Sequence, residues 1–596
     1  MRVADYIIEY LYQFGVKYIF LVPGGGAMYL NDAIAGHKDI KYIACHHEQA
    51  ATMAAAAYAK YSGKLGVVCV TTGCGGTNTL TGVLDAYQDG APILILSGQD
   101  HRFRTIKNSG LKLRQFGVQE ANIFPLAKAL TKYTAMVNNP ERIKYYLDKA
   151  LSMAFEGHPG PVWLDIPLDV QFENIDNPNF KFKNLAKPKD YKVDFLKIYD
   201  YLQDSKRPII IVGQGVRLGK AIPEFIKFVE KYRIPVVSTK LGLDVLPHNH
   251  PLYVGTIGIR GDRAGNFALQ NSDLVISLGA RLSVCTTGYT YKDFAREAKK
   301  IVVDINSDEH KKNTIQIDLF IECDVKHFLQ KIYTDYATPA NWISKCQHWK
   351  KIFPTYSAKL AETEKVNLYH FMEILTQKMR DDDVIIGDAG SSMFVPAQGL
   401  KIRDKQRFVC SGGQTAMGFV IPACVGISFA RDKGEVIGTT GDGSIQMNLP
   451  SLQTIKHHNL PVKLFVWNNN GYLTMRNTQN NYFKRTMAES PQTGVSFPDL
   501  EKIAYAYGIK YLKVTKTESL PLIIDNVLMC KGPIICEVMC LEQQQILGVS
   551  GKQLADGKFV SRPFEDMSPF LSRKVFFENM IVKPLESSYE DRKSVV

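Results

Sequence analysis

Residues 436–472 carry residue types that could hold a metal ion and a diphosphate. They read "VIGTTGDGSIQMNLPSLQTIKHHNLPVKLFVWNNNGY", which predicts strand, tight turn, helix and strand. Asp442 and Asn469 would then emerge at the carboxyl ends of parallel strands, where open α/β sheets bind ligands. With the Gly471 carbonyl they offer hard oxygen ligands suited to Mg²⁺ or Ca²⁺. Gly441 and Gly443 would let the backbone approach a diphosphate closely.

A "GDG" triplet alone is also typical of an ordinary turn between a strand and a helix. Here Asn469 comes 27 positions after Asp442 and is the middle one of three consecutive asparagines. The combination favours a metal and diphosphate site over a plain turn.

A single glutamate stands out near the N-terminus, in "IACHHEQAATMAAAAYAKY" (residues 43–61). Glu48 heads a run of small apolar residues, so its neighbours are expected to be buried. Partial burial removes water from a carboxyl group and suits it to sharing a proton with a ligand. The alternative is a solvated glutamate at the start of a helix.

Composition narrows the class of protein. The 596 residues are 45% hydrophobic and 22% charged, an ordinary globular balance. The N-terminus reads as an amphipathic helix and not as a signal peptide, and no apolar run is long enough to span a membrane. The eleven cysteines form no C-x-x-C pair, so we expect free thiols in a soluble, cytoplasmic protein. The net charge of +13 is spread along the chain, which favours anionic ligands and not nucleic acid.

The elements that must position these residues fall into three α/β blocks. Short apolar runs alternate with helical patterns, as in parallel sheets. We place domains at 1–175, 190–335 and 360–550, followed by a basic, Phe-rich tail at 551–596. The strand candidates are "KYIFLV", "GVVCVTT", "APILILSG", "RPIIIVGQGV", "PVVST", "DLVISLGA", "KKIVVDI", "DVIIGD", "EVIGTT", "VKLFVWN" and "GPIICEVM", and the first block closes near "GPVWLDIPLDV".

Several motifs together resemble the acetolactate-synthase branch of thiamine diphosphate (ThDP) enzymes. They are "VPGGGAMYLNDAI", "HHEQAATMAAAAYAK", "VTTGCGGTN", "APILILSGQ" and "SGGQTAMGFVIPA", with the "GDG…NNNGY" stretch. The resemblance covers most of residues 1–550. It implies an α/β fold of three doubly wound parallel-sheet domains: pyrimidine-binding, central and Rossmann-like, and diphosphate-binding. It also implies a homodimer or homotetramer in which Glu48 of one subunit meets the Asp442 site of another.

The same resemblance implies roles for individual residues. Glu48 would face N1′ of the cofactor's aminopyrimidine, and Gln119 is the second catalytic candidate. Asp442, Asn469 and the Gly471 carbonyl would hold Mg²⁺. The Thr415 carbonyl would accept from the 4′-amino group, and Met417 would separate the two rings of the cofactor. The other candidates for cofactor binding are Pro23, Gly24, Gly25, Ser391, Ser392, Gly441, Gly443, Ser444 and Tyr472.

The sequence departs from that branch in its substrate pocket. Val118 stands where the branch has Phe, and Thr478 is placed where it has Trp, which would leave room for a larger, more polar acceptor. Gly26 and Met475 are further substrate candidates. Ser391 and Ser392 replace Gln and His. "GARLSVCTTG" replaces a "GARFDDR"-type sequence near the family's flavin, so the resemblance leaves FAD binding open.

A basic segment precedes Gln119. Between Asp100 and Glu120 it contains Arg102, Arg104 and four further basic side chains but no acid, which suits phosphate groups near the active-site mouth. A solvated loop is the alternative.

These features predict a carboligase that decarboxylates a 2-oxoacid, with pyruvate as the first candidate, and adds the acyl unit to a large acceptor such as a nucleotide-linked keto-sugar. The alternatives are a simple decarboxylase, a diketone hydrolase, a true acetolactate synthase and a non-catalytic paralogue. The tail either packs against the dimer or closes over the active site.

Overall fold

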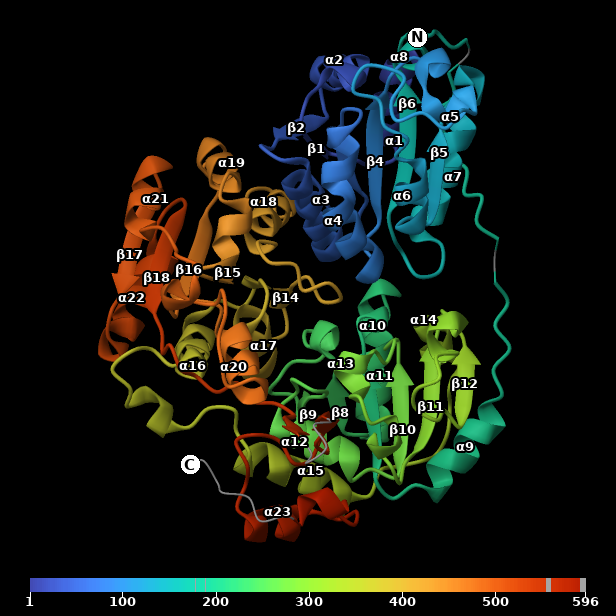
Figure 1. Ribbon diagram of the computed structural model, residues 1–596. Coiled ribbons are helices and arrows are strands. Elements are labelled where there is room, and N and C mark those ends of the chain that lie inside the picture. The colour runs from blue at the N-terminus through green and yellow to red at the C-terminus, as the bar shows by residue number, and fades with distance from the viewer. Residues whose placement is uncertain (177, 188, 554–558, 590–596) are drawn as a thin grey trace.

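The computed structural model describes residues 1–176, 178–187, 189–553 and 559–589. It contains three parallel six-stranded sheets, each covered by helices, and one short antiparallel pair (Figure 1). Three doubly wound α/β units are therefore confirmed.

The first sheet has the order β2-β1-β3-β4-β6-β5. Its interior strands carry almost only buried residues, as expected where helices cover both faces. The strands are β1 (Tyr18–Leu21), β2 (Lys41–Ala44), β3 (Gly66–Val70), β4 (Ile93–Gln99), β5 (Tyr133–Met136) and β6 (Val162–Pro167). The helices are α1 (Val3–Gln13), α2 (Met28–Gly36), α3 (Glu48–Ser62), α4 (Cys74–Gln88), α5 (Ile106–Ser109), α6 (Phe124–Ala129), α7 (Ile143–Phe155) and α8 (Leu168–Phe172).

The central sheet has the order β12-β11-β10-β7-β8-β9, the arrangement of Rossmann folds. The strands are β7 (Pro208–Val212), β8 (Val236–Ser238), β9 (Tyr253–Thr256), β10 (Leu274–Leu278), β11 (Lys299–Asp304) and β12 (Leu319–Glu322). The helices are α9 (Phe195–Asp204), α10 (Gly215–Leu218), α11 (Ile222–Tyr232), α12 (Arg263–Gln270), α13 (Val284–Thr287), α14 (Val325–Lys331) and α15 (Ala340–Ile352).

The third sheet, β14-β13-β15-β16-β18-β17, repeats the topology of the first. The strands are β13 (Val384–Gly387), β14 (Arg407–Val409), β15 (Val436–Gly441), β16 (Val462–Asn468), β17 (Lys510–Val514) and β18 (Ile534–Met539). The helices are α16 (Leu368–Lys378), α17 (Ser391–Gly399), α18 (Val420–Ala430), α19 (Ser451–His457), α20 (Leu473–Tyr482), α21 (Leu500–Ala506) and α22 (Leu520–Met529).

The first and third domains meet through α3 and α18, which pack side by side (Figure 1). A Cβ atom at Gly426 would lie 2.0 Å from the Ala54 carbonyl oxygen, so only glycine permits this approach. The contact holds α3, the helix of the first domain that begins at Glu48, against the domain that contains Asp442.

The described part of the tail packs on the central domain. It contains the pair β19 (Gly551–Gln553) and β20 (Phe559–Ser561), followed by α23 (Arg573–Asn579), which lies near α12 and α15 (Figure 1). Phe564 and Phe576 join the apolar cluster that contains Phe267, and Glu565 pairs with Arg296 at 2.8 Å. Residues 554–558 and 590–596 of the predicted tail lie outside the described residues.

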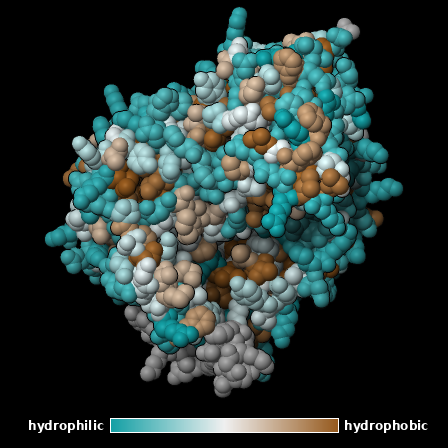
Figure 2. Space-filling view, turned by 45° about the horizontal axis from the view of Figure 1, so that its top comes forward, coloured by the Kyte–Doolittle hydropathy of each residue, from teal (hydrophilic) through white to brown (hydrophobic). Residues whose placement is uncertain are grey.

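Side chains on the surface are mixed in character. Figure 2 shows apolar residues gathered in a hollow near the middle of one face, within a largely hydrophilic surface. None of the helices in the described part of the chain combines the length and the apolar character that crossing a membrane requires. The eleven cysteines all lie among the described residues and none is in a disulfide; Cys74 and Cys285 are exposed.

Candidate active site

The turn after β15 places a carboxylate at the carboxyl end of the third sheet. Asp442 is 2% exposed. Its Oδ1 accepts from the Gly443 amide and its Oδ2 from the Gly471 amide, both at 2.9 Å. Burial raises the pKa of Asp442 to about 6, although these two hydrogen bonds oppose the rise. A buried carboxylate with lone pairs left over is suited to a cation.

Asn469 lies beside this carboxylate in the turn between β16 and α20. It is 3% exposed, and its Oδ1 has no hydrogen-bond partner among the described residues. A buried amide oxygen without a partner is costly unless a ligand satisfies it. Asp442 and Asn469 therefore fit a hard cation such as Mg²⁺.

Glycines shape the same turn. Gly471 has φ of +150°, and a Cβ atom there would lie 2.1 Å from the Glu489 carbonyl oxygen. A Cβ at Gly443 would lie 2.2 Å from the Tyr472 ring, whereas Gly441 faces open space. The backbone at Gly441 is thus accessible to a ligand, in keeping with a diphosphate.

Arg476, which the sequence pattern did not single out, holds this turn through hydrogen bonds to its backbone. Its Nε donates to Glu489 at 2.6 Å, and the pair is buried. Its guanidinium also donates to the carbonyl oxygens of Asn469 at 3.2 Å and Asn470 at 2.9 Å. Arg476 is a positioning residue for the metal turn.

A loop at 411–418 carries the two residues predicted to set the cofactor's conformation. Thr415 adopts φ of +57°, and Met417 is 38% exposed. The far end of the loop is held because Gly418 N donates to Ser444 Oγ at 3.1 Å and Phe419 N donates to Asp388 at 3.0 Å.

The N-terminal end of the loop, at Gly412 and Gly413, is hydrogen-bonded to the first domain. The Asp89 carboxylate accepts from the amides of Gly412 and Gly413, both at 2.7 Å. Asp89 and Asp85 in turn bind Lys60 Nζ at 2.7 and 2.8 Å, and all three side chains are buried. Asp85 near the end of α4 and Asp89 just after it are four residues apart, and this spacing was a signal for the cluster that the sequence reasoning missed.

Other predicted cofactor residues, and two of the predicted substrate residues, lie on helices that follow strands of the third sheet. Ser391 and Ser392 begin α17, where Ser392 Oγ donates to the Ala389 carbonyl at 2.7 Å. Met475 is 48% exposed on α20. Thr478 is exposed, and its hydroxyl donates back to the Thr474 carbonyl at 2.9 Å.

Glu48 lies in the first domain at the start of α3 and is 7% exposed. Its Oε2 accepts from Asn78 Nδ2 of α4 at 3.0 Å. In the described part of this chain, no hydrogen bond or ion pair joins Glu48 to the Asp442 turn.

The "PGGG" stretch (residues 23–26) follows β1, just as Glu48 follows β2, so both lie at the carboxyl end of the first sheet. Gly26 N donates to Thr71 Oγ1 at 3.0 Å, and a Cβ at Gly24 would lie 2.6 Å from Thr71. Gly25 has no atom within 4 Å of such a Cβ, so it faces open space next to Pro23.

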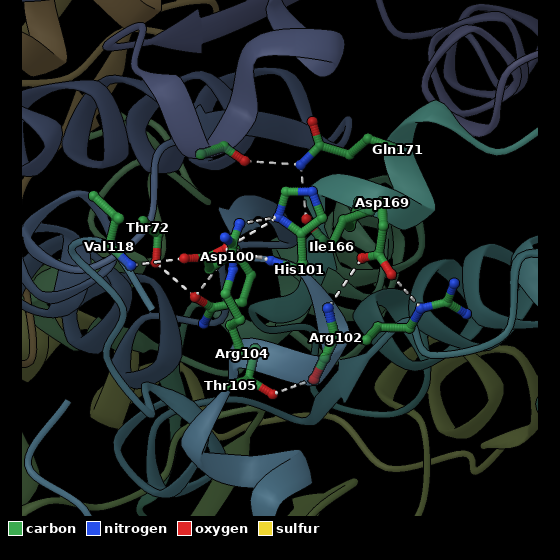
Figure 3. A network of polar contacts seen from close by, with 12 residues as sticks. Thr72, Asp100, His101, Arg102, Arg104, Thr105, Val118, Ile166, Asp169 and Gln171 are labelled. Carbon is green, nitrogen blue, oxygen red and sulfur yellow. Dashed lines mark hydrogen bonds and ion pairs between the residues drawn. The ribbon is translucent and has the colours of Figure 1, made fainter. Parts of the chain in front are cut away.

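Asp100 organises the basic segment (Figure 3). This buried carboxylate accepts from His101 N at 2.6 Å, Arg104 Nε at 3.1 Å and Val118 N at 2.6 Å. Burial raises the pKa of Asp100, but these hydrogen bonds outweigh it and leave the pKa below its ordinary value. The anchored turn presents Val118, which is 76% exposed, and Gln119, which adopts φ of +56°.

The two predicted phosphate-binding arginines are already engaged within the chain. Arg102 Nε donates to Asp169 at 2.7 Å (Figure 3). Its Nη2 pairs with Glu173. Arg104 is held by Asp100. Lys112 and Arg114 are exposed, and no described residue forms an ion pair with either. These two exposed cations are available to an anion, whereas Lys107, which also has no ion pair among the described residues, lies with its Nζ 3.8 Å from the centre of the Phe124 ring.

The central domain offers few backbone donors at its glycine turn. Gly213 N donates to the Leu278 carbonyl at 3.0 Å and Gly215 N to the Gly279 carbonyl at 2.9 Å. A Cβ at Gly213 would lie 2.2 Å from the Gly279 carbonyl oxygen. Because these amides are already paired and the turn is packed against β10, the turn does not fit the diphosphate of FAD.

Known proteins match this arrangement along its length. Three family models match: the thiamine pyrophosphate (ThDP) enzyme N-terminal TPP binding domain at residues 1–105, central domain at 196–332 and C-terminal TPP binding domain at 388–538. The acetolactate synthase large subunit of Lactococcus lactis subsp. lactis is 31% identical, over 94% of this chain and 96% of its own. The probable acetolactate synthase large subunit of Methanocaldococcus jannaschii is 31% identical over 90% and 92%. The isozyme 2 large subunit of Escherichia coli is 30% identical over 92% and 97%. The chain belongs to the thiamine pyrophosphate enzymes, in their acetolactate-synthase-like branch.

Proposed function

We propose that the protein is a ThDP- and Mg²⁺-dependent carboligase acting on a 2-oxoacid, with pyruvate as the first donor to test. The bond between the donor's carbonyl carbon and its carboxylate breaks and CO₂ leaves. A bond then forms from that carbon to the acceptor's carbonyl carbon, and the acceptor oxygen takes up a proton. The observation that carries the proposal is the buried, unpartnered Asn469 Oδ1 beside Asp442.

In this proposal Asp442, Asn469 and the Gly471 carbonyl would hold Mg²⁺, which would supply positive charge for the cofactor's diphosphate. Bound ThDP supplies a carbon nucleophile and an electron sink. Thr415 and Met417 orient the cofactor. Glu48 holds a proton at the aminopyrimidine, and its burial strengthens that interaction by excluding water.

We propose that a second copy of the chain completes each active site, in a homodimer or a homotetramer. Glu48 makes no hydrogen bond or ion pair with the Asp442 turn within the described residues of its own chain. Three large apolar side chains of the basic segment between Asp100 and Glu120 are also exposed: Phe103 (69%), Leu111 (60%) and Phe116 (48%). A partner subunit that covers them would bring Glu48 to the other chain's cofactor.

The acceptor has two candidates. The relatives named above favour an acetolactate synthase reaction, in which the acceptor is a second small 2-oxoacid. A larger acceptor such as a nucleotide-linked keto-sugar is favoured by a specific observation: Val118 and Thr478 are both small, exposed side chains. Lys112 and Arg114 would then supply cations for the acceptor's phosphates.

Mass spectrometry of products tests the proposal. The purified protein is mixed with ThDP, Mg²⁺ and pyruvate, first alone and then with acceptors from 2-oxoacids to nucleotide-linked keto-sugars. Acetolactate from pyruvate alone supports the synthase, and a two-carbon gain on a nucleotide-linked sugar supports the larger acceptor. Free acetaldehyde with no ligated product points to a simple decarboxylase. No ThDP-dependent consumption of any 2-oxoacid contradicts the proposal and leaves diketone cleavage to be assayed.

A further inference from the structure

A pocket of about 560 Å³ lies where the three domains meet, away from the site described above. Residues of the α3 end (Tyr61, Lys64), of the central domain (Arg217, Val245) and of the segment at 403–407 line it. The metal turn does not contribute to its lining, and α10, which begins at Gly215 of the glycine turn, contributes Arg217. Its volume falls within the range of small-molecule sites, about 300–1,000 Å³.

The lining of this three-domain pocket is strongly basic. Its acids are Asp244 and Asp404, and its cations are Lys64, Arg217, Arg403, Lys405 and Arg407. A second pocket of about 650 Å³ provides a comparison, because its charges balance: Lys378, Arg380 and Lys531 against Asp383, Glu435 and Asp525. Excess positive charge in a concave site attracts an anion.

Some of these cations are neutralised and others are free. Asp244 is shared by Arg217 Nη2 at 3.0 Å and Arg407 Nε at 2.6 Å, so one carboxylate faces two guanidinium groups. Lys64 and Lys405 are exposed, and no described residue pairs with either Nζ. The first and third domains thus each present an uncompensated ammonium group to the pocket, and Arg217 of the central domain adds a partly compensated charge.

The lining also includes apolar residues, which we call the apolar wall. They are Ile222, Ile226, Val245 and Pro247, and Tyr61 adds an aromatic ring to the lining. A ligand that suits both the cations and the apolar wall has a ring system joined to more than one phosphate. We propose that the three-domain pocket is a second ligand site, which binds a nucleoside polyphosphate with its phosphates on Lys64, Lys405 and Arg217 and its base on the apolar wall.

The pocket connects directly to the cofactor loop. Arg407 donates to the carbonyl oxygens of Tyr61 at 3.1 Å and Lys60 at 3.3 Å, and it begins β14. That strand leads into Gly412 and Gly413, whose amides donate to Asp89. Asp89 is in turn paired with Lys60, in the buried Lys60 cluster of Lys60, Asp85 and Asp89. A ligand that ties the three domains together at this point therefore changes the affinity for ThDP, by about fivefold or more. This regulatory step rests on the proposed function, whereas binding to the pocket does not.

Isothermal titration calorimetry tests the binding. The full chain, saturated with ThDP and Mg²⁺, is titrated with ADP, GDP, CDP and UDP in turn, and with inorganic pyrophosphate. At least one nucleotide is expected to bind once per chain, at least tenfold more tightly than pyrophosphate. The double variant Lys64→Glu/Lys405→Glu should weaken this binding at least tenfold. Lys531→Glu, in the balanced pocket, is the matched control and should leave it unchanged.

A second control separates this pocket from the active-site mouth. Binding should survive in Lys112→Glu/Arg114→Glu, whereas loss there and retention in the pocket variant would overturn the inference. Absence of binding by all four nucleotides, or equal binding of pyrophosphate, would also overturn it. A protein that binds nucleotide in this way but consumes no 2-oxoacid would retain the site and refute the proposed function. The regulatory step is measured separately, as the apparent Kd of ThDP with and without the nucleotide.

Discussion

Arg476 and Glu489 form a buried ion pair at 2.6 Å directly against the turn that presents Asn469 to a metal. The pair links the candidate metal site to the segment that follows α20. Apart from Glu489, the partners of Arg476 at this turn are the backbone carbonyls of Asn469 and Asn470. The arginine therefore shapes the turn without acting as a metal ligand.

Replacing Arg476 with Met should loosen this turn and leave Glu489 buried without a cation. Breaking a buried ion pair costs about 3–5 kcal/mol, so Tm should fall clearly. The apparent affinity for Mg²⁺ and ThDP should fall as well, because Asn469 and Gly471 lose their fixed positions. Thermal unfolding with and without ThDP and Mg²⁺ measures both effects.

Arg485→Met, at an exposed arginine after the same helix, is the control. Unchanged cofactor affinity in a folded Arg476→Met protein would refute the positioning role.

The Lys60 cluster should couple stability to cofactor binding. Lys60→Met leaves Asp85 and Asp89 buried without their cation and should destabilise the fold by about 3–5 kcal/mol. Asp89→Asn is milder, because the amide oxygen can still accept from Gly412 or Gly413. We expect it to fold and to show a raised KM for ThDP with a smaller change in kcat. A KM for ThDP equal to that of the unmodified protein would show that Asp89 does not position the loop.

The central domain is expected to carry no flavin. The amides of Gly213 and Gly215 are paired with carbonyls at the end of β10, which removes donors that a dinucleotide diphosphate needs. The visible absorbance spectrum of the purified protein, recorded again after incubation with FAD and gel filtration, checks this. A flavin spectrum that coelutes with the protein would contradict the expectation.

The sequence pattern predicted interior strands and missed edge strands. Each strand segment named from the sequence occupies an interior position in its sheet, where both faces are covered and most residues of the run are apolar. The edge strands lack such runs. In β2 three of the four residues are exposed, β12 and β17 are largely half-buried or exposed, and β9 is short with an internal glycine.

The candidate site shows the same division. Asp442, Asn469 and Gly471 lie near one another along the chain and could be placed from one βαβ pattern. The grip of Asp89 on Gly412 joins residues 323 positions apart, so no local pattern predicts it. Arg102 and Arg104 were chosen by their charge and by their place in the segment that leads to Gln119, and these criteria did not identify their partners Asp169 and Asp100. The roles of Glu48 and Gln119 remain predictions.

The most direct test of the account is the turnover of pyruvate by Glu48→Gln, measured as CO₂ release beside the affinity for ThDP. The amide keeps the shape of the side chain and can still contact Asn78, so ThDP affinity should stay within about threefold. Turnover should fall about 10²–10⁴-fold, because an amide cannot hold and return the proton. Asn78→Ala, which removes the neighbouring hydrogen bond but keeps the carboxylate, should lose far less. Full activity in Glu48→Gln with normal ThDP binding would contradict the account at its centre.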